Sequence, residues 1–532
     1  MFSKQNLPLK KELLNSLVFD YLSDKKELNG FYNFFPDKGG FRNAIDAIRT
    51  RKYDRSLLTG ILREQCKNVK NTSPASEKNI ELLLNENTYT ITTGHQLCLF
   101  TGPLYFIYKI FSVINLSEKL KNEFPENNFV PVYWMASEDH DFEEVNHLNI
   151  YSKKIEWHSS QKGAVGNFYT EELLNVKKEL HDILGKGDNN EFLFNLFTDA
   201  YLKHSDLASA TRYLVNELFG KYGLIVLDGN SKQLKESFIP FFEKDIFENI
   251  PGKNVNDSIS ELKSMKYEPQ VNPRAVNCFY MEDGIRARIE KEGEDYKVVG
   301  TDKKFTENEF RQIIKTNEQK ISPNVVLRPC YQQFILPNLA YVGGPGELAY
   351  WLEYKAMFDK LNLFYPVLVP RRFVTVIDKN TAQKINKLGF DINDVFRAEQ
   401  DLVKDYLGRN AELKDLGNYK NEIEKLYSKL NEDALQADKT LGGAVEAEKQ
   451  KVLNSINMIE QKINKAIKQK SENELNQIRL IKEKLFPGGI AQERVDNFSM
   501  YYSKWGKEFI DFLKDNLNYD LEKQYQLVIK ED

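Results

Sequence analysis

The chain has 532 residues, of which 74 are Lys or Arg and 78 are Asp or Glu, so its formal net charge is −4. A protein that binds nucleic acid through its overall charge needs a basic excess to neutralise phosphates, and this chain has none. Its hydrophobic content of 41% is typical of a globular protein, and at about 150 residues per domain its length predicts several domains.

The cysteines and the N-terminus indicate a cytoplasmic protein without a disulfide framework. The four cysteines contain no Cys-x-x-Cys pair and are Cys66, Cys98, Cys278 and Cys330. The N-terminus lacks an apolar core of signal-peptide length. The apolar run 97–116 is long enough to span a membrane, but Gly102-Pro103 interrupts it and Lys109 lies inside it. We therefore expect a buried strand, turn and helix there, and no membrane segment.

Five short apolar runs each end in polar or glycine-rich residues. They are residues 89–93, 129–136, 223–227, 324–327 and 365–369. Such runs without polar alternation indicate parallel strands that are covered on both faces. Helical patterns at 104–120 and 205–219 alternate with them, which predicts an α/β fold with a Rossmann-like, doubly wound parallel sheet. Ligands bind outside the carboxyl ends of the strands of such sheets, so we expect one cleft to collect the polar residues.

Inserts and a long arm interrupt this alternation. Residues 277–300 indicate a β-hairpin with its turn at Asp283-Gly284. Residues 371–486 contain no proline, and their apolar positions recur every three or four residues. This pattern predicts a long antiparallel coiled-coil arm with Gly442-Gly443 between its helices, either a dimerisation or docking arm or a solvated helix pair without a partner. The predicted parts are an N-terminal helical segment (1–88), a core in three parts (89–150, 205–250 and 321–375), a helical insert (151–204), a small β-containing insert (251–320), the coiled-coil hairpin (376–486) and a C-terminal helical segment that packs on the core (487–532).

Residues 137–147, which follow the second run, contain two of the six histidines and several carboxylates. One interpretation is general acid–base catalysis with recognition of an amine substrate. A second is a divalent metal site with His140, Asp141 and His147 as ligands. A third is a capped helix start, where acidic residues are favoured. The candidate catalytic residues are Glu138, Asp139, His140 and Asp141.

Two glycine-rich turns before predicted helices are candidate anion-binding loops, because glycine lets backbone N–H groups approach a ligand at a helix N-terminus. The first contains Gly94, His95, Gln96 and Gly102, followed by Tyr105 and Lys109. The second contains Gly343, Gly344 and Gly346, followed by Glu347, which suits a ribose hydroxyl or an amine. Neither turn matches a Walker or GxGxxG motif. The alternatives are bare turns and, at position 109, a surface lysine.

Three arginines follow the fourth and fifth apolar runs and are candidate ligands of carboxylate or phosphate groups. They are Arg328, Arg371 and Arg372. The adjacent Arg371 and Arg372 also fit a solvated pair. Cys98 and Cys330 lie near the predicted cleft, where we expect a small buried hydrophobe in each case, not a nucleophile.

Several long motifs, taken in order, resemble those of the bacillithiol biosynthesis cysteine-adding enzymes (BshC). They lie at 93–96, 99–109, 131–147, 327–329, 336–351, 370–371 and 485–494, and so cover about residues 90–495. The resemblance implies a Rossmann-like core with connecting inserts, a coiled-coil arm and a homodimer. It also implies the last step of bacillithiol synthesis, which joins the carboxyl group of L-cysteine to the glucosamine amine of glucosaminyl malate. The family commonly has Gln where His95 stands, which argues against an essential proton transfer by His95.

The resulting hypothesis is amide-bond formation between cysteine and an amino sugar. A carboxylate and an amine do not condense readily in water, so we expect activation, most simply by ATP with Mg²⁺, and zinc stays an open alternative. The first glycine-rich turn and Lys109 would then hold phosphate, and the second would hold the ribose or the sugar. Glu138, Asp139 and His140 would bind the amines or deprotonate the attacking one. Arg328, Arg371 or Arg372 would hold the malate carboxylates. The alternatives are a metal-dependent hydrolase or deacetylase that uses residues 138–147, and a non-catalytic coiled-coil assembly protein.

Overall fold

The computed structural model describes residues 2–410, 414–521, 523 and 525–531. The chain forms two compact units, which are described separately below. The larger unit contains residues 5–375 and 493–528, and the smaller contains 376–492 with the two chain ends.

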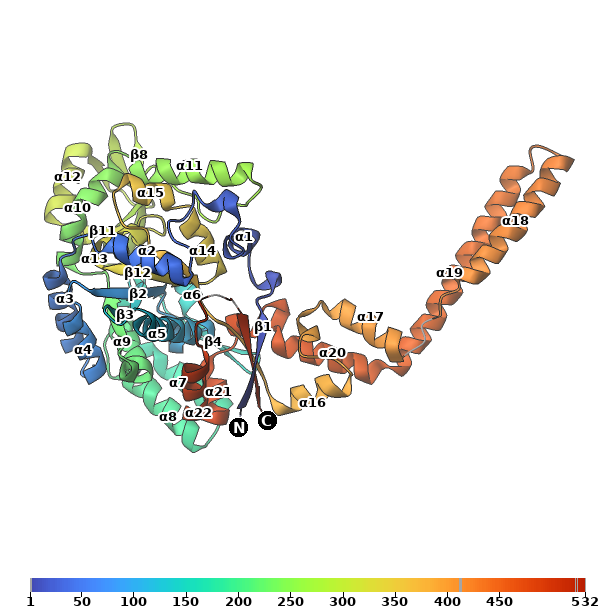
Figure 1. Ribbon diagram of the computed structural model, residues 1–532, viewed down its shortest axis with the longest axis horizontal. Helices are drawn as coiled ribbons and strands as arrows, with labels where there is room; N and C mark the ends of the chain where they lie inside the picture. The colour runs from blue at the N-terminus through green and yellow to red at the C-terminus, as the bar shows by residue number, and fades with distance from the viewer. Residues whose placement is uncertain (1, 411–413, 522, 524, 532) are drawn as a thin grey trace. The chain divides into compact units, whose positions relative to one another are not determined.

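A five-stranded parallel sheet lies at the centre of the larger unit (Figure 1). Its strands are β2 (Thr88–His95), β3 (Asn128–Met135), β6 (Ile225–Asp228), β12 (Asn338–Gly343) and β13 (Val367–Pro370). The spatial order is β13-β12-β2-β3-β6, so counted along the chain the strands run 5-4-1-2-3, which is the Rossmann order. The predicted Rossmann-like core is confirmed, and the direction of winding reverses between β2 and β12.

One of the five predicted strands is wrong. Residues 324–327 form a turn between β11 (Ile321–Pro323) and α13 (Arg328–Ile335). The Asn324 side chain accepts hydrogen bonds from the backbone N–H groups of Val326 and Leu327, and this local bonding competes with a strand. The missing strand of the sheet is β12, whose residues are buried throughout.

Helices pack on the strands that they connect. The helix α5 (Tyr105–Glu123) follows β2, contacts β2 and β3, and is buried along most of its length. The helix α9 (Leu207–Phe219) precedes β6, and α14 (Pro345–Leu352) follows β12. The described residues contain no helix that is both long and apolar enough to cross a membrane. The apolar run at 97–116 instead supplies a turn and the first part of α5.

The larger unit contains further helices, of which the first four belong to its N-terminal segment. They are α1 (Ser16–Leu22), α2 (Lys38–Ile48), α3 (Arg55–Lys67), α4 (Pro74–Leu82), α6 (Phe142–Val145), α7 (Leu174–Leu184), α8 (Asp188–Phe197), α10 (Lys232–Ile246), α11 (Ile250–Ser264), α12 (Glu307–Thr316), α15 (Lys355–Lys360), α21 (Phe498–Trp505) and α22 (Lys507–Asn516). The insert at 151–204, which we expected to be helical, also contains β5 (Lys153–Glu156), and this strand pairs with β4 (His147–Ile150), which precedes the insert.

A second, antiparallel sheet has the strand order β10-β9-β8-β7-β11. Its other strands are β7 (Cys278–Glu282), β8 (Ile285–Glu292), β9 (Asp295–Val298) and β10 (Lys304–Thr306). The predicted hairpin is confirmed, because Glu282 pairs with Ile285 across the turn and Gly284 has a φ of 68°.

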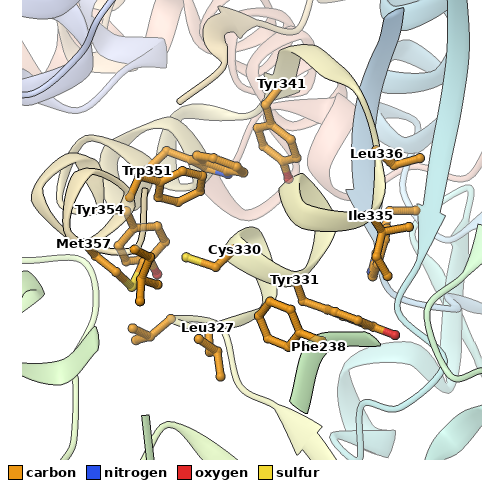
Figure 2. Close-up of a cluster of buried hydrophobic side chains, with 14 of the residues drawn as sticks. Phe238, Leu327, Cys330, Tyr331, Ile335, Leu336, Tyr341, Trp351, Tyr354 and Met357 are labelled. Carbon is orange, nitrogen blue, oxygen red and sulfur yellow. The ribbon is translucent and has the colours of Figure 1, made fainter. Parts of the chain in front are cut away.

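One hydrophobic cluster connects the two sheets (Figure 2). Cys330 and Tyr331 of α13 lie between Phe238 of α10 and Trp351 of α14, and all four side chains are fully buried. Burial raises the pKa of the Cys330 thiol well above its usual value, so this side chain is a small buried hydrophobe, as expected.

The smaller unit contains the predicted arm. Its helices are α16 (Lys379–Lys387), α17 (Glu399–Asn410), α18 (Gly417–Ala437), α19 (Gly442–Lys470) and α20 (Glu472–Leu485). Lys420 near the start of α18 pairs with Glu460 in the second half of α19, so the two helices run antiparallel. The hairpin is therefore confirmed, but its second arm is divided into α19 and α20 at Ser471.

The ends of the chain contribute strands that the sequence analysis missed. The strands β1 (Phe2–Pro8), β14 (Phe373–Ile377) and β15 (Tyr525–Glu531) form a three-stranded sheet in the order β1-β15-β14.

Two glycines test the packing of the core. A Cβ atom at Gly229, which follows β6, would lie 2.4 Å from Cζ2 of Trp134, whereas one at Gly60 in the middle of α3 would meet nothing within 4 Å. We expect Gly229→Ala to lower the free energy of unfolding by about 1–3 kcal/mol through overpacking. Gly60→Ala should raise it by about 0.5–1 kcal/mol through helix propensity. Urea unfolding followed by tryptophan fluorescence measures both, and an equally stable Gly229→Ala variant would contradict the contact with Trp134.

Candidate active site

A pocket of about 310 Å³ opens at the carboxyl ends of β2, β3 and β12, beside the point where the winding reverses. This is where Rossmann-like sheets bind ligands. The predicted site residues that line it are Gly94, His95, Gln96, Tyr105, Lys109, Asp139, Arg328, Gly344, Gly346, Glu347 and Arg371. The predicted residues outside this lining are Gly102, Glu138, His140, Asp141, Gly343 and Arg372.

A buried ion pair joins α5 to α14 in this pocket. The Lys109 side chain is only 3% exposed, its Nζ lies 2.8 Å from Oε2 of Glu347, and it also donates to the carbonyl oxygen of Gly94. The Glu347 carboxylate further accepts hydrogen bonds from the Tyr341 hydroxyl (2.7 Å) and the Gly344 N–H (2.8 Å). Burial raises the pKa of Glu347, but the Lys109 charge and these hydrogen bonds outweigh it and lower the pKa below its usual value.

This ion pair changes the interpretation of both residues. Lys109 is neither a surface lysine nor a cation free to hold phosphate, because the Glu347 carboxylate and the Gly94 carbonyl already take its donors. The Glu347 carboxylate likewise accepts hydrogen bonds from Lys109, Tyr341 and Gly344, so few of its lone pairs are left to accept a hydrogen bond from a ribose hydroxyl. Both residues therefore shape the pocket.

His95 is a neutral imidazole. Its ring stacks on Tyr105, with 5.2 Å between the ring centroids, and its Nδ1–H donates to the carbonyl oxygen of Gln96 (3.1 Å). Burial, with the positive charge of Lys109, lowers the pKa of His95 to about 3. The neighbouring Cys98 has its pKa raised by burial to about 12, so it is a thiol at neutral pH and not a nucleophilic thiolate.

The predicted catalytic loop contributes one carboxylate to the pocket lining. Asp139 lines the pocket, whereas Glu138 turns to a buried ion pair with Lys235 of α10. The Asp141 side chain is 57% exposed, and as the residue before α6 it makes no side-chain capping bond. Asp139 is therefore the candidate of this loop that can meet a ligand.

The ligand set of the predicted metal site is not assembled. His140 packs against Phe279, and His147, the first residue of β4, bonds to the side chain of Asn146. In the part of the chain that the structure describes, no three His, Cys, Asp or Glu side chains come together in a group that could hold a metal ion. The geometry of the described residues therefore gives no support to the interpretation of His140, Asp141 and His147 as a shared metal site.

The three predicted arginines have different surroundings. Arg371 lines the pocket but pairs with Glu493 at 2.6 Å. Arg372 lies outside it, with its guanidinium 4.0 Å from the ring centroid of Tyr519. The prediction that both cations point into one cleft is therefore wrong for Arg372. Arg328 is the one of the three that faces the pocket without a carboxylate within 4 Å among the described residues.

Glycine at position 94 lets Arg328 approach the end of β2. A Cβ atom at Gly94 would lie only 3.3 Å from Nη1 of Arg328. Burial lowers the pKa of Arg328, but the neighbouring Tyr350 and Tyr341, and then the carboxylates of Glu347 and Asp139, together raise this pKa above its usual value. Arg328 is thus held as a cation at the pocket wall.

Several other residues of the lining carry no functional signal in their local sequence. They are Trp134, Ala136, Pro323, Asn324, Val325, Pro345, Tyr350 and Arg494. Arg494 is exposed, lies 5.8 Å from the ring centroid of Tyr105 and has no carboxylate partner among the described residues. It follows the Pro-Gly-Gly turn at 487–489, and the family motif at 485–494 is the feature of the sequence that points to this region.

The strand order and the pocket define an α/β protein of the Rossmann-like class with a polar pocket at its switch point. Two family models match nearly the whole chain. The N-terminal Rossmann-like domain of bacillithiol biosynthesis BshC matches residues 2–372, and the C-terminal coiled-coil domain of the same family matches residues 374–529. The chain belongs to the BshC family, as its motifs predicted.

Similar proteins extend over almost the same length. Three of them share the name "Putative cysteine ligase BshC". The protein from Flavobacterium psychrophilum is 43% identical over 96% of each chain, and that from Flavobacterium johnsoniae is 40% identical over 97% of each. The protein from Bacillus cereus is 28% identical over 94% of this chain and 95% of its own.

The buried His95 should make stability depend on pH. The pKa of His95 is about 3 in the folded chain, against a usual 6.5. When the pH is lowered below 6.5, the unfolded chain therefore binds the proton before the folded chain does, and the free energy of unfolding decreases as the pH decreases. We expect His95→Gln to flatten this fall by about 1 kcal/mol per pH unit in urea unfolding. His181→Gln, at an exposed histidine, is the control. Parallel curves for wild type and His95→Gln would contradict the burial of a neutral imidazole.

Proposed function

We propose that this protein is a cysteine ligase that joins the carboxyl group of L-cysteine to the amine of glucosaminyl malate, with ATP and Mg²⁺ as activator. Membership of the BshC family over nearly the whole chain supports the place in bacillithiol synthesis. The observation that carries the choice of substrate is the pocket itself, which presents the Asp139 carboxylate together with the guanidinium groups of Arg328 and Arg494. Such a set suits a molecule that carries both an amine and carboxylates.

In this proposal, Asp139 meets the amine. A carboxylate holds an ammonium group by a charge-assisted hydrogen bond and accepts a proton from the amine as the carbon–nitrogen bond forms. Glu138 takes no part, because its carboxylate pairs with Lys235 and it does not line the pocket. His95 contributes hydrogen bonding without proton transfer, since its low pKa keeps it neutral.

Arg328 and Arg494 bind the acidic groups. Arg371 is neutralised by Glu493, and Arg372 faces away, so the malate carboxylates fall to the two arginines that lack an acidic partner among the described residues. The same cations and the Gly344–Gly346 turn at the start of α14 suit phosphate oxygens. Activation would transfer the adenylyl group of ATP to the cysteine carboxylate with loss of pyrophosphate, and attack by the amine would then release AMP.

Incubation of the protein with L-cysteine and glucosaminyl malate, with and without ATP and Mg²⁺, tests this function. Mass spectrometry should detect bacillithiol only with ATP, together with equal amounts of AMP and pyrophosphate. Absence of product in both reactions would overturn the ligase assignment. Product without ATP would overturn only the activation step.

Variants of the acidic loop sharpen the same assay. Asp139→Asn should lower kcat by about 100-fold, because an amide cannot take the proton of the amine. Glu143→Gln is the matched control, since Glu143 lies exposed outside the pocket lining, and it should retain wild-type kcat. Equal activity of the Asp139→Asn variant would contradict the role of this carboxylate.

We also propose that the helical hairpin associates with a second copy of the chain. Large apolar side chains are exposed on α18, on α19 and in the turn between them, at Leu426, Leu430, Leu435, Leu441, Met458 and Ile459. An apolar group of this kind on a polar helix pair marks an interaction surface.

Light scattering coupled to gel filtration tests this association. The wild type should elute as a dimer, and Leu430→Glu combined with Ile459→Glu should elute as a monomer, because charges on this surface oppose its burial. Lys429→Glu, an exposed charge reversal on the same helix, is the control. A monomeric wild type would overturn the proposal.

A further inference from the structure

A buried arginine from the antiparallel sheet reaches the catalytic loop of the parallel sheet. Arg286 lies in β8, its side chain is 4% exposed, and its Nη1 is 2.8 Å from Nδ1 of His140 and 3.4 Å from Oδ1 of Asp139. These two residues belong to the loop after β3, and Asp139 lines the pocket. Sequence reasoning placed Arg286 only in the hairpin and gave it no role.

The remaining contacts fix the guanidinium in place. Nε donates to Oγ of Ser322 (3.2 Å), and Nη2 donates to the carbonyl oxygen of Pro323 (3.4 Å), both in β11. The ring of Phe279 lies against the Arg286 guanidinium at 4.1 Å and against the His140 ring at 5.3 Å. A planar guanidinium held on both edges and one face presents its Nη1 in one direction only.

The chemistry of arginine then determines the state of His140. A guanidinium carries only donors, so the Nδ1 atom that it contacts must be an unprotonated acceptor. The proton of the neutral imidazole is therefore on Nε2, on the far side of the ring from Arg286. Loss of the guanidinium would remove the donor that holds Nδ1 unprotonated and leave His140 with the longer contact of its Nε2 to Oδ1 of Asp141 (3.8 Å).

Stability alone is a poor explanation for this arrangement. Burial of a cation costs free energy, and an apolar side chain of similar volume often replaces a buried charge without loss. Among the described residues, the acidic group within 4 Å of the guanidinium is Asp139, which is itself at the pocket wall. The charge of Arg286 is thus directed at a pocket residue.

We propose that Arg286 is a positioning residue, which holds the Asp139 carboxylate at the pocket wall and fixes His140 as the Nε2–H tautomer. The antiparallel sheet is then part of the active site and does more than support it. The consequence for amine binding rests on the proposed ligase function, whereas the tautomer of His140 does not.

Nuclear magnetic resonance of the full chain with ¹⁵N-labelled histidine tests the tautomer without any substrate. At pH 8.5, where a free imidazole is neutral, His140 should show an unprotonated Nδ1 and a protonated Nε2, with its signals assigned by loss in His140→Gln. Arg286→Met should move the two nitrogen shifts toward each other, and Arg286→Lys should do so in part. Arg288→Met is the matched control, because Arg288 lies two residues along β8, is 42% exposed and pairs with Glu290. An unchanged His140 spectrum in Arg286→Met would overturn the proposal.

Steady-state kinetics test the effect on Asp139. Arg286→Met should raise the KM for the amine substrate about 10- to 100-fold, because the Asp139 carboxylate that binds the amine is displaced. The KM for cysteine should change little. Arg286→Lys should recover part of the loss, and Arg288→Met should match the wild type. Equal rises in both KM values would indicate a general structural defect and overturn the positioning role. If the wild type makes no product but the tautomer still depends on Arg286, the ligase assignment fails and the positioning of His140 stands.

Discussion

The ion pair between Lys109 and Glu347 is the constraint on which the pocket depends. It joins α5, which follows β2, to α14, which follows β12, and so bridges the two strands between which the winding reverses. Two buried charges are tolerated only when each is paired and its remaining hydrogen-bonding groups are satisfied. Here Lys109 also donates a hydrogen bond to the Gly94 carbonyl, and the Glu347 carboxylate also accepts hydrogen bonds from the Tyr341 hydroxyl and the Gly344 N–H. The backbones of both glycine-rich turns are thereby held at the pocket.

This pairing decides what a ligand meets. Because Lys109 and Arg371 are neutralised by Glu347 and Glu493, the charge at the pocket does not follow from the number of charged residues near it. The cations left without an acidic partner among the described residues are Arg328 and Arg494, on different parts of the lining. In the proposed function, these two cations bind the acidic groups of the substrate and Asp139 binds its amine.

Local sequence patterns were sufficient for the sheet but insufficient for the pairing of its side chains. The apolar runs with β-branched residues predicted four of the strands, and an Asp-Gly turn predicted the hairpin at Gly284. The run at 324–327 failed because a single side chain, that of Asn324, bonds its own backbone. Lys109 and Glu347 are 238 positions apart, and Arg286 and His140 are 146 apart, so no spacing rule connects them.

Two pairs of adjacent like charges show one aspect of the side-chain contacts that can be predicted from the sequence. Successive side chains of an extended backbone point to opposite sides, so two neighbours there cannot both face one cleft. Arg371 and Arg372 lie between β13 and β14, and the first lines the pocket while the second packs on Tyr519. Glu138 and Asp139, in the loop where the chain turns after β3, also separate, the first toward Lys235 and the second to the pocket wall. A pair of like charges after a strand therefore predicts one residue that faces the ligand pocket and one that is held by a structural partner, and the pocket-facing residue is oriented by contacts of its own, Arg286 for Asp139 and Glu493 for Arg371.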